Sequence, residues 1–74
     1  MGIMTRDNVF TPSNRYYDVN ADRLRERRKE LKLTQADVAA ALGYRANYVS
    51  KLETGVITQV SADVMGLLSA VLKF

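Results

Sequence analysis

Polar side chains recur at helical spacing between residues 46 and 54. On a helix they would share one outward face, whereas Val49 and Leu52 would point to the opposite side. Amide, hydroxyl and ammonium groups of this kind donate and accept hydrogen bonds. The members of this polar stripe are Asn47, Ser50, Lys51 and Thr54. The chemistry that they favour is noncovalent recognition.

Several residue types that usually carry catalysis are missing from the 74-residue chain, which has no His and no Cys. Zinc sites depend on these two residues, so we expect neither a metal site nor a cofactor. Without His, acid–base chemistry near neutral pH would need a carboxylate or a lysine with a strongly shifted pKa. The composition therefore predicts that the chain is not an enzyme.

The positive charge is concentrated in one segment. The net charge of +3 comes from 11 Lys and Arg against 8 Asp and Glu, and the whole excess lies in residues 20–33. The ionic side chains there are Arg23, Arg25, Arg27, Arg28, Lys29 and Lys32, with Asp22, Glu26 and Glu30. Such a helix can be a solvated face with pairs such as Glu26 with Lys29. It becomes a phosphate-facing surface when a neighbouring element reads bases, and the charge alone leaves both interpretations open.

Two short helices are predicted ahead of the polar stripe. The first covers about residues 21–31, and the second covers residues 35–42. A capping-box-like pattern, with Thr34 followed three positions later by Asp37, marks the start of the second helix. Gly43 follows at the place where a left-handed residue ends a helix. A glycine turn therefore separates this helix from the one that carries the polar stripe.

Two further helices complete the predicted fold. The helix over residues 46–54 ends at Gly55, and a fourth begins at Ser61. Gly66 either marks close packing or is simply tolerated at a cost of up to ~1 kcal/mol. Apolar residues of the fourth helix follow the i, i+3, i+4, i+7, i+8 pattern at Val64, Leu67, Leu68, Val71 and Leu72. No strand is predicted between residues 20 and 74.

The segment before residue 20 has a different character. Val9-Phe10 and Tyr16-Tyr17 flank a turn-rich tetrapeptide at residues 11–14. A small hairpin and a disordered tail are both compatible with this pattern. We therefore expect an N-terminal arm over residues 1–19 and a helical domain over residues 20–74.

Residues 24–39 and 40–55 resemble the two halves of a Cro/Xre-like helix-turn-helix domain, the lambda-repressor fold. The Leu-Thr-Gln, Leu-Gly and Val-Ser-Lys-Leu-Glu-x-Gly elements stand at the spacing of that family, and the resemblance extends over residues 22–72. It implies an all-α bundle of four short helices, or five, that contains a helix-turn-helix. The N-terminal arm would be irregular or hairpin-like.

The resemblance also implies a function, that of a sequence-specific DNA-binding transcription regulator. The simplest form is a small dimeric repressor of phage, plasmid or restriction-modification type. Its helix over residues 45–54 would enter the major groove of a pseudo-palindromic operator in double-stranded DNA. The alternative is an antitoxin-type or other protein-binding module that sequesters a cognate toxin or another partner as well as binding DNA. Either would be cytoplasmic, bacterial or phage-encoded and associated with the nucleoid, with no membrane partner or small-molecule ligand.

Individual roles follow from the same resemblance. It implies that the side chains reading bases are Arg45, Ala46, Asn47 and Lys51, and that those contacting phosphates are Gln35, Tyr48, Ser50 and Thr54. Arg28 and Glu53 match a structural pair that ties the first helix to the third. Simpler roles stay open for three of these residues: Asn47 as a helix cap, Tyr48 as an aromatic at the edge of the core, and Gln35 as a good first-turn residue.

The chain departs from the family pattern at several positions, among them Arg27, Lys32 and Arg45. Arg27 replaces an apolar residue, which thins the apolar face of the first helix. Lys32 replaces a frequent glycine, so a left-handed conformation there would be strained. Arg45 replaces the usual Ser or Thr cap of the third helix.

Dimerisation is expected on physical grounds, because one copy is small and its exposed apolar residues need cover. The predicted dimer contact consists of Val56, Ile57, Val60, Leu72 and Phe74.

Overall fold

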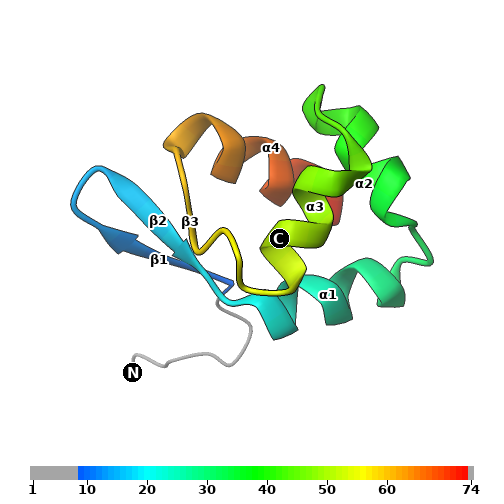
Figure 1. Cartoon of the computed structure of the whole chain (residues 1–74), viewed down its shortest axis with the longest axis horizontal. Helices are drawn as coiled ribbons and strands as arrows, with labels where there is room; N and C mark the ends of the chain where they lie inside the picture. Colours follow the sequence, from blue (N-terminus) through cyan, green and yellow to red (C-terminus); the bar gives the residue numbers. More distant parts are fainter. Residues whose placement is uncertain (1–8, 74) are drawn as a thin grey trace.

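The structure is a computed structural model that describes residues 9–73 (Figure 1). Its helices are α1 (Ala21–Glu30), α2 (Gln35–Leu42), α3 (Ala46–Glu53) and α4 (Ala62–Leu72). Its strands are β1 (Phe10–Ser13), β2 (Tyr16–Val19) and β3 (Gln59–Val60). The four predicted helices are confirmed, and the described residues contain no fifth. The prediction of a purely all-α fold is wrong, because a small antiparallel sheet accompanies the helices.

The N-terminal arm forms a hairpin, which is one of the two states that its sequence allows. β1 pairs with β2 so that Ser13 faces Tyr16, and Asn14 adopts a left-handed φ of 58° in the turn between them. The tetrapeptide at residues 11–14 is turn-rich in sequence, yet Thr11 and Pro12 belong to β1. An edge strand accepts proline because its outer backbone groups need no partner within the sheet.

The third strand is not predicted by the sequence. β3 lies against β2, with Tyr17 opposite Val60, and the backbone N–H of Val19 donates to the carbonyl of Thr58 at 2.9 Å. The side-chain amide of Gln59 donates to Asp18 at 2.8 Å. A strand of two residues is too short to show an alternating pattern, so no periodicity could have revealed it.

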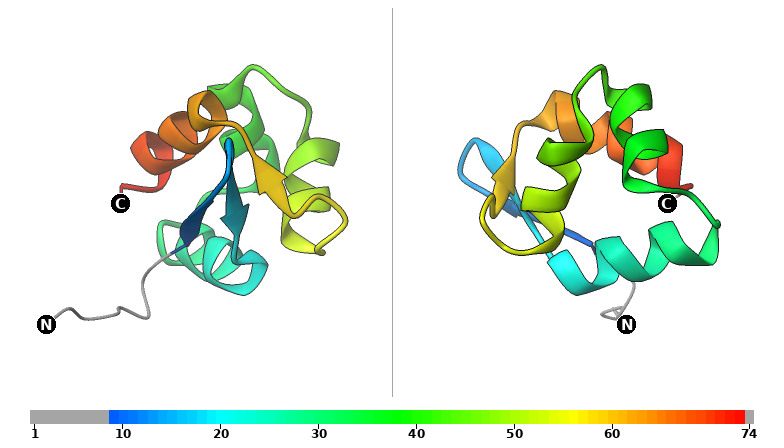
Figure 2. Two further views of the ribbon diagram at one scale, coloured as in Figure 1. Left: turned by 90° about the vertical axis from the view of Figure 1, so that its left-hand side faces the viewer. Right: turned by 45° about the vertical axis from the view of Figure 1, so that its right-hand side comes forward.

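The core lies between the helices and the sheet. Its fully buried large side chains come from all four helices, and Val60 of β3 and Val9, just before β1, are buried with them. β2 and β3 lie against α4, as the views in Figure 2 show. The largest fully buried side chains are Leu24, Val38, Val49, Leu52, Leu68 and Leu72. The arm therefore shares one core with the helices.

The turn between α1 and α2 contains the strained residue that the sequence predicts. Lys32 has a φ of 59°, and the N–H groups of Lys32 and Leu33 donate to the carbonyls of Lys29 and Arg28. This double hydrogen bond is the Schellman ending of a helix, in which glycine is the favoured left-handed residue. Lys32 adopts the same left-handed conformation, although its Cβ makes that conformation sterically unfavourable.

Helix α2 starts at a complete capping box. The Asp37 N–H donates to the Thr34 hydroxyl at 3.0 Å, and the Thr34 N–H donates to the Asp37 carboxylate at 2.9 Å. The backbone hydrogen bond from Thr34 lowers the pKa of Asp37. Gly43 ends the helix with a φ of 79°, as predicted. Gly66 of α4 faces open space, which leaves toleration rather than close packing as its interpretation.

Arg27 shows how the chain accommodates a charged residue on the inner side of α1. Its guanidinium donates to the carbonyl oxygens of Leu72 at 2.8 Å and of Lys73 at 3.3 Å, at the end of α4. The last carbonyls of a helix lack partners inside the helix and carry partial negative charge. Arg27 therefore joins α1 to α4 by capping α4, where an apolar residue would have packed against it.

Candidate functional site

Helices α2 and α3 are joined by a turn at residues 43–45 (Figure 1). The buried Val38 and Leu42 of α2 belong to the same core cluster as Val49 and Leu52 of α3. α3 therefore has one face fixed in the core and the opposite face turned outward.

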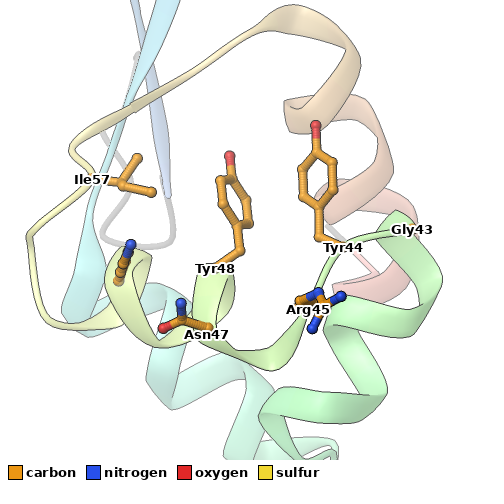
Figure 3. A pocket seen from close by; sticks show the side chains of 7 residues that line it. Gly43, Tyr44, Arg45, Asn47, Tyr48 and Ile57 are labelled. Atoms are coloured by element: carbon orange, nitrogen blue, oxygen red, sulfur yellow. The ribbon is translucent and has the colours of Figure 1, made fainter.

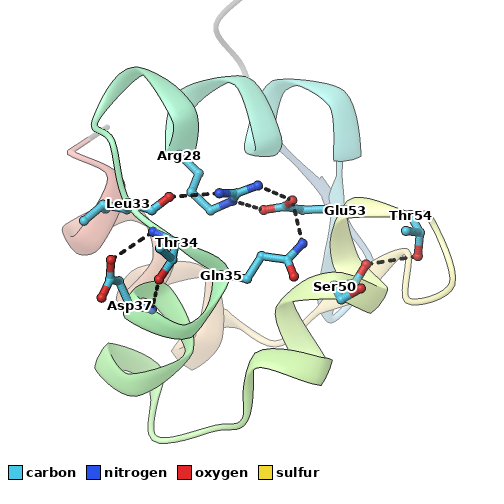
Figure 4. Close-up of polar contacts among 8 residues, drawn as sticks. All are labelled: Arg28, Leu33, Thr34, Gln35, Asp37, Ser50, Glu53 and Thr54. Atoms are coloured by element: carbon cyan, nitrogen blue, oxygen red, sulfur yellow. Dashed lines mark hydrogen bonds and ion pairs between the residues drawn. The ribbon is translucent and has the colours of Figure 1, made fainter.

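A buried ion pair fixes α3 to the first two helices (Figure 4). Arg28 of α1 donates to the Glu53 carboxylate through Nε at 2.6 Å and through a second nitrogen at 3.0 Å. The Glu53 side chain is only 1% exposed, and its hydrogen bond raises the pKa of Arg28. Arg28 also donates to the carbonyl of Leu33 at 2.8 Å. A carboxylate at this depth needs such partners, so the pair sets the orientation of α3.

Gln35 joins the same network from the first turn of α2. Its amide nitrogen donates to Oε1 of Glu53 at 3.1 Å. This bond uses one of the two amide hydrogens and leaves the second hydrogen and the carbonyl oxygen available. The contact also holds the side chain at the N-terminus of α2, where backbone N–H groups lack helical partners. Gln35 is therefore more than a good first-turn residue.

The outward face of α3 carries several polar groups with no partner among the described residues. Arg45, Asn47 and Lys51 are exposed, and none of them forms an ion pair within residues 9–73. Arg45 is the N-cap residue of α3 but makes no side-chain capping bond. Asn47 is the second residue of the helix and likewise makes no capping hydrogen bond. These three side chains are available to a ligand.

The remaining residues of the polar stripe are partly engaged. The hydroxyl of Thr54 donates to the backbone carbonyl of Ser50 at 3.0 Å, inside the last turn of α3 (Figure 4). Ser50 is half-buried, and Ala46 lies beside the N-cap of the helix. The outward face of α3 is therefore polar along its length, with its charged members at Arg45 and Lys51.

A shallow groove runs beside this face (Figure 3). The rings of Tyr44 and Tyr48 meet edge to face, with centroids 4.5 Å apart and planes at 68°. Burial, together with the neighbouring Tyr44, raises the pKa of Tyr48, which packs against the edge of the core. Tyr44 is not singled out by the sequence motifs, and because it precedes the N-cap of α3, no helical spacing signals its contact with Tyr48. The residues that line the groove are Gly43, Tyr44, Arg45, Asn47, Tyr48, Lys51 and Ile57.

The cations of α1 are arranged differently from those of α3. Arg23 pairs with Glu26, whereas the sequence suggests Lys29 as the partner of that glutamate. Arg25 pairs with Asp22 at 3.3 Å, and Arg27 pairs with Glu30 at 3.1 Å. With Arg28 bound to Glu53, all four arginines of the segment have an acidic partner. The solvated, paired face is thus the better description of most of α1.

The structure corrects the predicted dimer contact. Val60 and Leu72 are 3% and 0% exposed in the single chain, because both pack in its core. They are therefore not available to a second copy. Val56 is 70% exposed and Ile57 is half-buried, while Phe74 lies outside the described residues.

Residues 9–73 contain no group of three or more His, Cys, Asp and Glu side chains arranged to hold a metal ion. Over the same residues, each helix is too short or too polar to cross a membrane.

Comparison with known proteins assigns a family to this arrangement. A family model described as a helix-turn-helix matches residues 24–74, from the first helix onward. No curated protein and no solved structure matches the chain.

Proposed function

The chain belongs to the Cro/C1-type helix-turn-helix family of DNA-binding transcription regulators, and on this basis we propose that it is a dimeric repressor with a pseudo-palindromic operator. The observation that carries the proposal is the outward face of α3, where Arg45, Asn47 and Lys51 have no partner in the described chain. Side chains left available at a helix surface are what major-groove recognition requires.

Base recognition falls to the N-terminal half of α3 and to Lys51. Asn47 can form two hydrogen bonds with adenine, and Arg45 can form two with guanine, each worth ~1–3 kcal/mol of discrimination. Lys51 lies one turn after Asn47 and donates to guanine. The methyl group of Ala46 packs against a thymine methyl. Discrimination in this proposal rests on four side chains.

Phosphate contacts surround this centre. Gln35 donates its second amide hydrogen to a phosphate at the N-terminus of α2, where unpaired N–H groups also attract anions. Tyr48 and Ser50 donate their hydroxyl groups to the backbone, and Thr54 does so when its hydroxyl turns away from the Ser50 carbonyl. These contacts carry no sequence information and fix the position of α3 on the duplex.

The dimer proposal follows from the operator geometry. Two recognition helices must lie about 34 Å apart to enter successive major grooves on one side of the duplex. Val56, exposed in the loop after α3, is the apolar residue that supports a contact between copies. In this proposal residues 20–74 form the DNA-binding domain and residues 1–19 form an arm. Repression results when the bound dimer blocks a promoter.

A selection experiment tests the function and identifies the operator sequence at the same time. The protein is used to select its preferred sites from a random duplex library, and footprinting on the DNA beside its own gene supplies a second source. Affinity is then measured on a selected site and on a scrambled site. We expect Asn47→Ala to lose discrimination between the two by about 5- to 150-fold, the equivalent of one lost base contact.

Gln35→Ala is the matched variant, and it should weaken both sites to a similar degree. Circular dichroism must show that this variant keeps its helices, because Gln35 also touches Glu53. Equal losses on both sites for Asn47→Ala would refute its role in base recognition. Light scattering that shows only a monomer at high micromolar concentration, with and without the site, would refute the dimer.

A further inference from the structure

The two flanks of α3 differ in chemistry. On a helical projection Asn47 and Lys51 lie at the centre of its outward face. One flank holds Ser50 and is continued by Gln35, whose amide bonds to Glu53 on that side. The other flank consists of Tyr48, against which Tyr44 packs, and Ile57 across the groove. We call the set Tyr44, Tyr48 and Ile57 the aromatic flank.

The aromatic flank is an apolar surface with a positively charged border. Tyr44 is 46% exposed, a large fraction for a ring of its size. Figure 3 shows the Tyr44 and Tyr48 rings pointing to the same side of α3, toward the start of α4. Over residues 9–73, Arg45 and Lys51 border the groove without ion pairs, and no acidic side chain lines it. The surface therefore suits an occupant that is partly apolar and negatively charged.

We propose that the aromatic flank is a second DNA contact, on which the rings of Tyr44 and Tyr48 pack against deoxyribose groups of one strand. The sugar-phosphate backbone alternates apolar sugars with anionic phosphates, which matches two rings bordered by two cations. A helix in the major groove has one strand on each side. Gln35 contacts one strand and the aromatic flank contacts the other. This inference rests on the proposed DNA binding and adds Tyr44 to the interface.

The test compares three variants of the full chain on a selected site and a scrambled site. Tyr44→Ala should raise the Kd about fivefold on both sites, because sugars are the same in every sequence. Tyr44→Phe keeps the ring and should retain the wild-type Kd. Tyr16→Ala is the matched control, since Tyr16 is 51% exposed on the hairpin, outside the groove. It should also leave the Kd unchanged.

The dependence of affinity on salt gives an independent measurement. The Tyr44 ring neutralises no phosphate, so it releases no counterion from the DNA when the protein binds. The slope of log K against log salt should therefore be the same in Tyr44→Ala as in the wild type. Circular dichroism and thermal melting of each variant identify any loss caused by unfolding. Tyr48 is partly buried, so it is replaced by Phe and by Leu, which both keep the edge of the core filled. The Kd values of Tyr48→Phe and Tyr48→Leu are then compared.

Three results would overturn the inference while leaving DNA binding intact. The first is a Kd for Tyr44→Ala equal to that of Tyr16→Ala. The second is a loss confined to one site that deoxyuridine in place of thymidine reproduces, because the ring would then read a methyl group. The third is conversion of a dimer to a monomer by Tyr44→Ala. If the wild-type chain bound neither site even at low salt, the proposed function itself would fail.

Discussion

Helices α1 and α3 both carry cations, but within the described residues the arginines of α1 are ion-paired, unlike its Lys29, whereas the cations of α3 and its N-cap are not. The four arginines of α1 each have an acidic partner, at Asp22, Glu26, Glu30 or Glu53. On α3 and its N-cap there are two cations, Arg45 and Lys51, and neither has one within the described residues. A phosphate approaching α1 would meet carboxylates close to the guanidinium groups, whereas one approaching α3 would not. Whether each cation has an acidic partner therefore says more about where an anion can bind than the number of cations does.

The ion pairs of α1 differ in how deeply they are buried. The exposed pairs of α1 are each worth ~0–1 kcal/mol. The Arg28 pair differs, because its partner Glu53 is a buried residue of α3. Arg28 is thus the one arginine of α1 whose removal should disturb the position of α3.

The largest effect should come from breaking this pair. Arg28→Met leaves the Glu53 carboxylate buried without its main partner, and we expect a loss of about 3–5 kcal/mol in the free energy of unfolding. Urea denaturation measures it. Arg28→Met combined with Glu53→Leu should recover most of the loss, since the pair is then replaced by apolar side chains. A single variant as stable as the wild type would show that the pair does not hold the two helices together.

The second prediction compares one cation from each helix on DNA. Lys51→Ala should weaken binding to a selected site by about tenfold, which corresponds to ~1.4 kcal/mol for one lost contact. Arg25→Ala should change the Kd by less than about twofold, because the pair with Asp22 already neutralises that arginine. Fluorescence anisotropy at fixed salt measures both variants. Similar losses in the two would remove the distinction between α1 and α3.

A smaller and opposite effect is expected at the end of α1. Lys32 holds a φ of 59°, so Lys32→Gly should raise the free energy of unfolding by about 0.5–1 kcal/mol. Gly43→Ala is the control, because the same left-handed conformation at a φ of 79° should make alanine destabilising. Thermal melting of the two variants should therefore give shifts of opposite sign. A destabilised Lys32→Gly would mean that the lysine side chain contributes more than the strain of its backbone.

The smallest effect concerns acid and the start of α2. The Thr34 hydrogen bonds lower the pKa of Asp37, so its contribution to stability is present above the ordinary carboxyl pKa and disappears as the pH falls through the lowered value. Asp37→Asn should be slightly less stable than the wild type at about pH 6. The difference should shrink as the pH falls below about 4. A difference that grows in acid would contradict this sign, and urea titrations across this range measure it.

The helices and their caps could be predicted because their signals are local. Thr34, Asp37 and Gly43 stand within one helix of one another, and the structure places them as expected. The ion-pair partners of the α1 arginines were harder to predict, since Glu26 could pair with either of two cations one turn away. Arg27 reaches the end of α4, forty-five residues along the chain, and no local pattern contains that information.

The surface residues of the candidate site show a similar division. Asn47 and Lys51 are exposed as their helical spacing predicts, because one turn of helix fixes which side they occupy. Val60 is predicted from the sequence to be exposed and is buried, because its strand partner Tyr17 lies more than forty positions earlier. Whether an apolar residue in a loop is covered depends on such distant segments.

The pairing of β2 with β3 also bears on how the protein folds. Asp18 and Gln59 are 41 residues apart, and the three helices α1 to α3 lie between them. Closing so long a loop costs chain entropy, whereas the helix contacts between α2 and α3 are close in sequence and form at little cost. We therefore expect the sheet to form late, after the helices have collapsed. Hydrogen exchange during refolding should protect the amides of α2 and α3 before that of Val19.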